Sequence, residues 1–102
     1  LGLAMEILNG NGDAGCAEQT AAELQRLGVQ VTRMTNAANF DYTKSQLVIW
    51  SANNTNMRTL QAYMGLKRKN IKTKSNKKRI DATLVLGSDW EQIVKHLKSK
   101  KE

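Results

Sequence analysis

The amino-acid sequence predicts an α/β domain, an α+β sandwich in which two main helices pack on one face of a small, mostly antiparallel sheet. Three observations predict this class. Segments with apolar residues at helical spacing alternate along the chain with short segments rich in Val, Ile and Leu. Glycine and asparagine separate most of these segments, as turns require. The chain of 102 residues is long enough for one domain with a modest core of its own.

The first strand and the first helix are expected within residues 5–28. Residues 5–8 are apolar and run into the turn residues 9–12, which predicts a strand. Asp13 is the expected N-cap of the helix that follows. The apolar face of this helix consists of Ala17, Ala21, Leu24 and Leu27. Gly28 then ends the helix, because glycine readily takes the left-handed conformation at a helix C-terminus.

The next two strands are expected to form a long hairpin. Residues 29–34 alternate apolar and polar side chains, as a half-buried strand does, and residues 46–50 are continuous enough to form a central strand. The polar residues 35–44 between them carry two aromatic side chains but no helical pattern. Because parallel strands need a long crossover that usually contains a helix, this link predicts an antiparallel pair.

A second helix and two more strands are expected in residues 53–87. Asn53, Asn54 and Thr55 offer N-caps for the helix, and Gly65 ends it. The apolar face of this helix consists of Met57, Leu60, Tyr63 and Met64. Residues 70–73 are weakly strand-like, and residues 81–87 predict the last strand.

A short helix completes the domain. Ser88 and Glu91 have the S-x-x-E spacing of a capping box, and the apolar face behind them consists of Trp90, Ile93, Val94 and Leu97. The order β-α-β-β-α-(β)-β-α suggests a ferredoxin-like split βαβ arrangement, with a small mixed sheet as the alternative. Residues 1–98 are expected to form a single domain and residues 99–102 a frayed basic tail.

Positive charge is concentrated in one stretch of the chain. The net charge is +7, yet residues 1–56 contain five acidic and only three basic residues. No acidic residue interrupts the basic run of Lys67, Arg68, Lys69, Lys72, Lys74, Lys77, Lys78 and Arg79. Such a run predicts either contact with an anionic surface or a solvated loop that maintains solubility. It contains no aromatic residue to stack on bases, so a nucleic-acid-associated module is only the alternative.

A glycine motif lies between the first strand and the first helix. Residues 10–15 fit the G-x-G-x-x-G pattern of dinucleotide-binding folds. A dinucleotide site also needs an acidic residue ~20 positions further on, where this chain has Met34, Thr35 and Asn36. Asp13 within the motif would also repel phosphate. We therefore interpret the motif as a tight structural turn and expect no cofactor.

No catalytic constellation emerges from the sequence, and we expect no enzyme. His96 is the only histidine and is interpreted as a surface residue. A helix N-terminus would lower the pKa of Cys16, but without a nearby base this lone cysteine is interpreted as buried filler. Phe40 and Tyr42 are expected to pin their loop to the core, with a ligand platform as the alternative, and Asp41 is expected to accept a local turn hydrogen bond.

Neither a membrane span nor a signal peptide is expected in this chain. No apolar run approaches the ~20 residues that cross a bilayer. The first four residues carry no basic n-region.

Three blocks of sequence, residues 6–17, 35–45 and 81–89, together resemble the C-terminal domain of LytR–CpsA–Psr cell-envelope proteins. That family combines an L-N-G-x-G strand and turn, an N-A-x-x-F-D-Y segment and a final V-L-G-x-D strand. The chain departs from the pattern at Cys16, where an aliphatic residue is common, at Thr35, where glycine is frequent, and in the basic run.

The resemblance implies an accessory, extracytoplasmic domain of a bacterial cell-envelope protein, without catalysis of its own. Its partner would be peptidoglycan, another anionic envelope polymer or a protein. No catalytic residue is carried over. The matching loop positions, where a ligand or partner surface would be expected first, are Asn9, Gly10, Asn11, Gly12, Asn36, Phe40, Asp41 and Tyr42.

Overall fold

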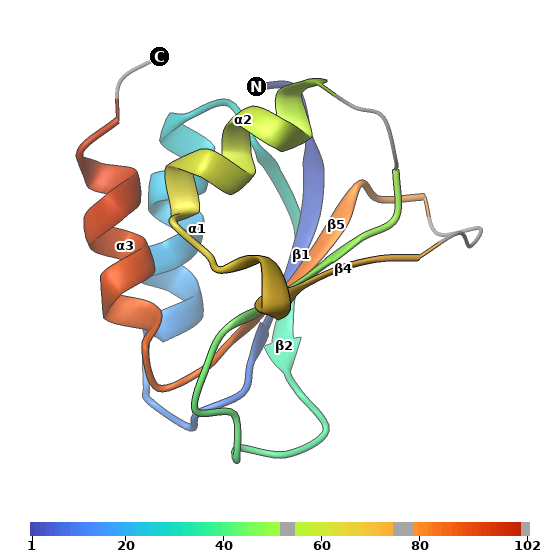
Figure 1. The fold of residues 1–102 in the computed structure, drawn as a ribbon. Coiled ribbons are helices and arrows are strands. Elements are labelled where there is room, and N and C mark those ends of the chain that lie inside the picture. Colours follow the sequence, from blue (N-terminus) through green and yellow to red (C-terminus); the bar gives the residue numbers. More distant parts are fainter. Residues whose placement is uncertain (52–54, 75–78, 101–102) are drawn as a thin grey trace.

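The computed structural model describes residues 1–51, 55–74 and 79–100 as an α/β sandwich with three helices and a five-stranded sheet (Figure 1). In chain order the elements are β1 (Ala4–Asn9), α1 (Cys16–Arg26), β2 (Gln30–Asn36), β3 (Gln46–Ile49), α2 (Thr55–Met64), the short 3-10 helix η1 (Arg68–Asn70), β4 (Ile71–Thr73), β5 (Ala82–Leu86) and α3 (Trp90–Lys98). The α/β class and the expected order of strands and helices are confirmed.

The sheet is mixed, and the expectation of a mostly antiparallel sheet was wrong. The strand order is β2-β1-β5-β3-β4. β1 runs parallel to both β2 and β5, β3 runs parallel to β4, and only β3 and β5 are antiparallel. The parallel pairs β1–β2 and β3–β4 arise because α1 and α2 each carry the chain back across one face of the sheet.

The long hairpin between β2 and β3 is absent, because β1 and β5 lie between these two strands. Residues 37–45 instead cross one edge of the sheet. β5 is the central strand of the sheet, a position it could not occupy if β2 and β3 were paired as a hairpin. All five residues of β5 are buried. The most apolar strand thus has neighbours on both sides, while β2 is left at the edge with mostly exposed side chains.

All three helices cover the same face of the sheet (Figure 1). The alternate residues Met5, Ile7, Leu84 and Leu86 are fully buried in the core beneath the helices. On the opposite face, strand register places the partners Arg33, Glu6, Thr83, Val48 and Lys72 in one row across all five strands. We call this second side the uncovered face, because no helix of the described residues packs on it (Figure 1).

Two predicted N-caps are wrong, and one predicted C-terminus is confirmed. α1 begins at Cys16 after Gly15, and no side chain caps it. Asp13 instead accepts a hydrogen bond of 2.8 Å at Oδ2 from the indole N–H of Trp90. Gly28, with a φ of 84°, follows the end of α1 as expected. The caps expected at residues 53 and 54 lie outside the described residues.

The capping box before α3 does not form. Asp89 is the N-cap residue, and its side chain makes no capping hydrogen bond. The Ser88 hydroxyl donates to the Tyr42 carbonyl at 3.4 Å, so it is directed toward the loop of residues 37–45 and not toward the helix. Tertiary contact with this loop therefore replaces the local cap.

At its other end, α3 is held by α1. The Arg26 guanidinium donates from Nη1 to the Lys100 carbonyl at 2.8 Å and from Nη2 to the Leu97 carbonyl at 2.7 Å. The Leu97 carbonyl also accepts from the Lys100 N–H at 3.1 Å, and a cation favours this negative end of the helix dipole. No helix in the described part of the chain is long and apolar enough to cross a membrane.

Candidate functional site

The loops that the sequence analysis selected meet at one edge of the sheet. The parallel strands β1, β2 and β5 all end at this edge. β3 runs antiparallel to β5, so β3 and its parallel neighbour β4 begin there. The edge therefore gathers residues 10–15, residues 37–45, residues 87–89 and η1, several of them visible at the bottom of Figure 1. We call it the loop edge.

The glycine turn is closed by its own asparagine side chains. Asn9 Oδ1 accepts hydrogen bonds from the backbone N–H groups of Asn11, at 3.0 Å, and Gly12, at 2.9 Å. Asn11 Oδ1 accepts one from the Asp13 N–H at 2.6 Å. A phosphate cradle needs such N–H groups free to face the ligand. These three are occupied within the turn itself.

Asn11 also ties the turn to the end of β5. Its Nδ2 group donates to the carbonyl of Gly87 at 2.7 Å and to that of Leu86 at 3.2 Å. The neighbouring Gly10 N–H donates to the same Leu86 carbonyl at 2.9 Å. The asparagines of the motif thus serve as internal partners for backbone groups.

Tyr42 pins the crossing loop to this turn. Its N–H donates to the Gly10 carbonyl and its carbonyl accepts from the Ser88 N–H, both at 3.0 Å. The ring lies so close to Gly10 that a Cβ there would be 2.7 Å from Tyr42 Cδ1. Phe40 differs, because 51% of its surface is exposed and its ring only borders Gly12.

The remaining predicted loop residues are exposed. Asn36 ends β2 beside Asn9. Asp41 takes part in a local turn through its backbone, since its N–H donates to Asn39 Oδ1 at 2.9 Å. We expected the Asp41 side chain to accept a hydrogen bond in the turn. In this bond the Asn39 side chain is the acceptor and the Asp41 backbone is the donor.

The fold divides the basic run among three places. Lys67, Arg68 and Lys69 lie at the loop edge, in and just before η1. Lys72 lies on β4 and belongs to the uncovered face. Lys74 and Arg79 follow β4 and precede β5, at the opposite edge of the sheet. Lys77 and Lys78 lie outside the described residues. The run is therefore not one continuous site.

At the loop edge, three lysines surround a small pocket of about 160 Å³. We call it the lysine pocket; it is lined by Lys44, Gly65, Leu66, Lys67, Lys69, Asn70, Asp89 and Gln92. Within the described residues, none of the three lysines forms an ion pair. The carboxylate of Asp89 accepts hydrogen bonds at Oδ1 from the Ser45 N–H and hydroxyl, at 2.8 and 2.7 Å. Because the lining includes one aspartate and three lysines, the pocket has a net positive charge.

Asn70 adds a hydrogen-bonding group to this pocket. Its side chain is nine-tenths buried, and Oδ1 accepts a hydrogen bond from Gln46 Nε2 at 3.3 Å. No hydrogen bond joins Asn70 Nδ2 to any residue that the structure describes. Lys44, Asn70 and Gln92 were missed by the sequence analysis, because no motif links them and only the strand order brings them together.

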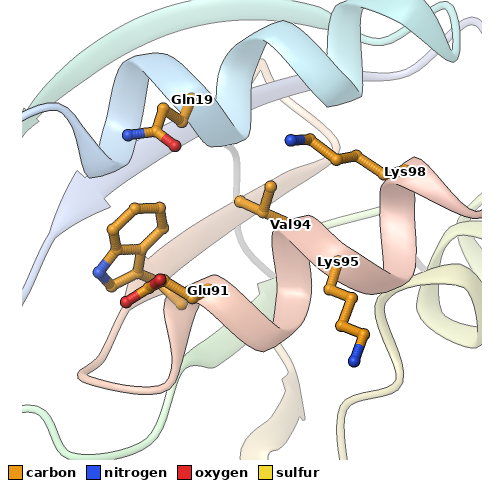
Figure 2. Close-up of a pocket in the computed structure, with 6 residues that line it drawn as sticks. Gln19, Glu91, Val94, Lys95 and Lys98 are labelled. Carbon is orange, nitrogen blue, oxygen red and sulfur yellow. The ribbon is translucent and has the colours of Figure 1, made fainter.

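A second groove, of about 290 Å³, lies between α1 and α3 (Figure 2). It is lined by Gln19, Trp90, Glu91, Val94, Lys95 and Lys98. Figure 2 shows Val94 directed between the helices, Lys98 extended toward α1 and Lys95 pointing away from it. Glu91 offsets part of the positive charge of the two lysines, so we do not select this groove as the anion site.

The structure places Cys16 in the core and His96 at the surface. Cys16 is fully buried, and burial raises the pKa of its thiol, the opposite of the effect expected at a helix N-terminus. His96 is exposed on α3 and lies against Gly65. Among the described residues, no group of three or more His, Cys, Asp and Glu side chains could hold a metal ion.

Comparisons with known proteins identify a family and a fold. The sequence model of the family described as LytR cell envelope-related transcriptional attenuator matches residues 2–90. Among solved structures, the soluble domain of a conserved hypothetical secreted protein from Mycobacterium marinum matches with a TM-score of 0.54 and 19% sequence identity, over 96% of this chain and 84% of that chain. At this identity the likeness shows the fold alone. No significant match was found among curated proteins.

Proposed function

The chain belongs to the LytR cell envelope-related transcriptional attenuator family, and from this premise we propose that it is a non-catalytic domain that binds an anionic polymer of the bacterial cell envelope. The proposal includes an extracytoplasmic location, in line with the secreted protein whose soluble domain shares the fold. The sequence-based alternatives are peptidoglycan or a protein as the partner, and a nucleic-acid-associated basic module, which the competition with DNA below tests.

One observation carries the proposal, namely the lysine pocket. Lys44, Lys67 and Lys69 come from two separate segments of the chain, and each leaves its ammonium group without an ion pair among the described residues. Like charges held around one pocket repel one another, so an anion that enters relieves this repulsion. The unused Nδ2 group of Asn70 offers a directed hydrogen bond to the same anion.

The absence of catalysis is part of the proposal and rests on how the reactive groups are placed. Cys16 is buried and its thiol is held protonated by the raised pKa, so it is a poor nucleophile. His96 contacts Gly65 at the surface of α3. An acyl- or phosphoryl-transfer site would need a nucleophile beside a base.

The test measures retention of the domain on an anionic wall polymer at two salt concentrations. The variant Lys67→Gln with Lys69→Gln removes two charges of the lysine pocket. The matched control Lys95→Gln with Lys98→Gln removes two charges from α3. Because an exposed ion pair contributes ~0.2–1 kcal/mol, the pocket variant should bind roughly 2- to 30-fold more weakly, whereas the control should bind as the parent does.

Three results would contradict the proposal. Equal losses in the pocket and control variants would indicate a diffuse charge effect. Retention that does not fall with salt would exclude an electrostatic contact at the surface. Efficient displacement of the polymer by short duplex DNA, with a steep dependence on salt, would favour the nucleic-acid alternative.

A further inference from the structure

We propose that a groove on the uncovered face binds the pyranose rings of a polyanion, so that the ligand of this domain is a sugar-containing polymer and not a bare polyphosphate. This inference deepens the proposed function and rests on it. The groove, of about 330 Å³, is lined by Tyr42, Gln46, Leu47, Val48, Lys72, Lys74 and Val85. We call it the sheet groove.

The sheet groove has an apolar floor and a basic wall. Val48 and Val85 form part of the floor, and Tyr42 lies at the end nearest the loop edge, where its backbone bonds to Gly10 and Ser88. Register pairs Val48 with Lys72, so Lys72 borders the floor from the adjacent strand β4. Lys74 lies two residues further, about 6.6 Å along the strand at ~3.3 Å per residue.

A chain of hydrogen-bonded side chains lies on the same face, next to the floor, since register pairs Val48 with Thr83. The Trp50 indole N–H donates to Thr83 Oγ1 at 2.9 Å, and the Thr83 hydroxyl donates to Glu6 Oε2 at 2.6 Å. Arg33 Nη1 lies 3.7 Å from Glu6 Oε1 at the far side of the sheet. These contacts join side chains of β2, β1 and β5 to Trp50, which follows β3, so the part of the face that borders the groove is ordered without a ligand.

Charge and apolarity together define the ligand. Within the described residues neither Lys72 nor Lys74 forms an ion pair, which favours an anionic ligand. Lysine contacts alone would suit any polyphosphate, but valine methyl groups and a tyrosine ring gain nothing from phosphate oxygens. A pyranose ring presents C–H groups on its faces and hydroxyls on its rim, and therefore fits an apolar floor with an ammonium wall.

The sheet groove and the lysine pocket are neighbours. Gln46 lines the groove, and its Nε2 group donates to Asn70 of the pocket at 3.3 Å. A polymer longer than one repeat can therefore place a sugar on the sheet groove and an anionic group in the lysine pocket. Binding two linked sites raises the affinity through effective concentration.

The test follows methyl groups by NMR while two probes are added separately. One probe is a sugar-phosphate polymer with a hexose in every repeat, and the other is linear polyphosphate of equal charge. Both should shift the backbone signals of Lys67 and Lys69 in the lysine pocket. Only the sugar-phosphate polymer should shift the methyl signals of Val48 and Val85, and the methyls of Val94, in the groove between α1 and α3, serve as the internal control.

Each outcome has a separate meaning. Shifts at the lysine pocket alone, with both probes, would overturn the inference and leave the proposed function intact. Shifts at neither site would overturn the proposed function. Equal valine shifts with both probes would also overturn the inference, because the groove would then respond to charge alone.

Variants provide a second measurement. Lys72→Gln with Lys74→Gln should weaken binding of the sugar-phosphate polymer roughly 2- to 30-fold, with an unchanged thermal midpoint. Lys95→Gln with Lys98→Gln is the matched control and should leave binding unchanged. An unchanged affinity in the groove variant would contradict the inference.

Discussion

Replacing Asn11 by Ala tests whether the asparagines of the glycine motif are structural. The substitution removes the Nδ2 donor to the Gly87 carbonyl at 2.7 Å and the Oδ1 acceptor of the Asp13 N–H at 2.6 Å. It also removes the longer bond of 3.2 Å to the Leu86 carbonyl. The turn, the end of β5 and the start of α1 would then lose their shared side chain.

The expected loss of stability follows from these contacts. A net contribution of ~0.5–1.5 kcal/mol for each of the two short bonds gives about 1–3 kcal/mol. For a domain of ~100 residues, 1 kcal/mol corresponds to ~4–8 °C in the thermal midpoint, so a loss of about 2 kcal/mol lowers the midpoint by roughly 8–16 °C. Urea unfolding followed by circular dichroism measures the loss in the free energy of unfolding from the shift of the transition midpoint.

The matched control is Asn39→Ala. Asn39 accepts one hydrogen bond, from the Asp41 N–H at an exposed site, so its loss should cost no more than about 0.5 kcal/mol. Equal stabilities of Asn11→Ala and the parent, together with a loss of polymer binding, would refute the reasoning. Asn11 would then be a ligand-binding residue and not a structural one.

Three further predictions concern stability. Gly87→Ala should destabilise the domain by about 1–3 kcal/mol in urea unfolding, because the new Cβ would lie 2.5 Å from the backbone carbonyl carbon of Lys44. Arg26→Lys should accelerate amide hydrogen exchange in the last turn of α3, since lysine cannot bond both carbonyls that the guanidinium now holds. Because burial raises the pKa of Cys16, the unfolded chain loses its thiol proton first as the pH rises, so stability should fall above about pH 8.5, and less so in Cys16→Ala.

Each of these has a distinct control. Gly12→Ala adds a Cβ that comes no closer than 3.5 Å to Phe40, so its cost should be limited to the ~1–2 kcal/mol of a left-handed residue. Amide exchange in the first turn of α3 should be unchanged in Arg26→Lys. Identical pH profiles of Cys16→Ala and the parent would contradict the assigned role of the buried thiol.

Local sequence patterns predicted the elements well, because those elements follow local rules. The periodicity of the apolar residues from Ala17 to Leu27 and the glycine after them correctly located α1. Residues 81–87 correctly predicted the last strand, which spans Ala82–Leu86. The N-caps failed, because Asp13 and Ser88 make tertiary hydrogen bonds to Trp90 and Tyr42 in place of local ones.

The strand order could not be deduced from the pattern alone. The polar link of residues 37–45 suits a hairpin as well as it suits a crossing of the sheet edge. The strand order is decided by the free energy gained when the apolar residues of β5 are buried between β1 and β3. This gain depends on the whole sheet and not on one local segment.

The candidate site was only partly predicted, because it too depends on the strand order. The basic run was visible in the sequence, but its division among the loop edge, the uncovered face and the opposite edge depends on the path of β4. Lys44 and Asn70 join Lys67 only after the sheet has formed. The sequence analysis selected Asn9 and Asn11 as candidate site residues. It did not predict that their side chains form hydrogen bonds with backbone groups of the turn.

The most direct measurement is a backbone NMR titration of the domain with an anionic sugar-phosphate polymer at low and moderate salt. The account predicts shifts at Lys44, at residues 67–70 and at Gln92, which weaken as salt is added. Shifts confined to residues 9–12 and 40–42 would contradict it, because the ligand would then bind the turn whose polar groups the structure shows to be occupied. An absence of shifts anywhere would exclude the polymer as the ligand.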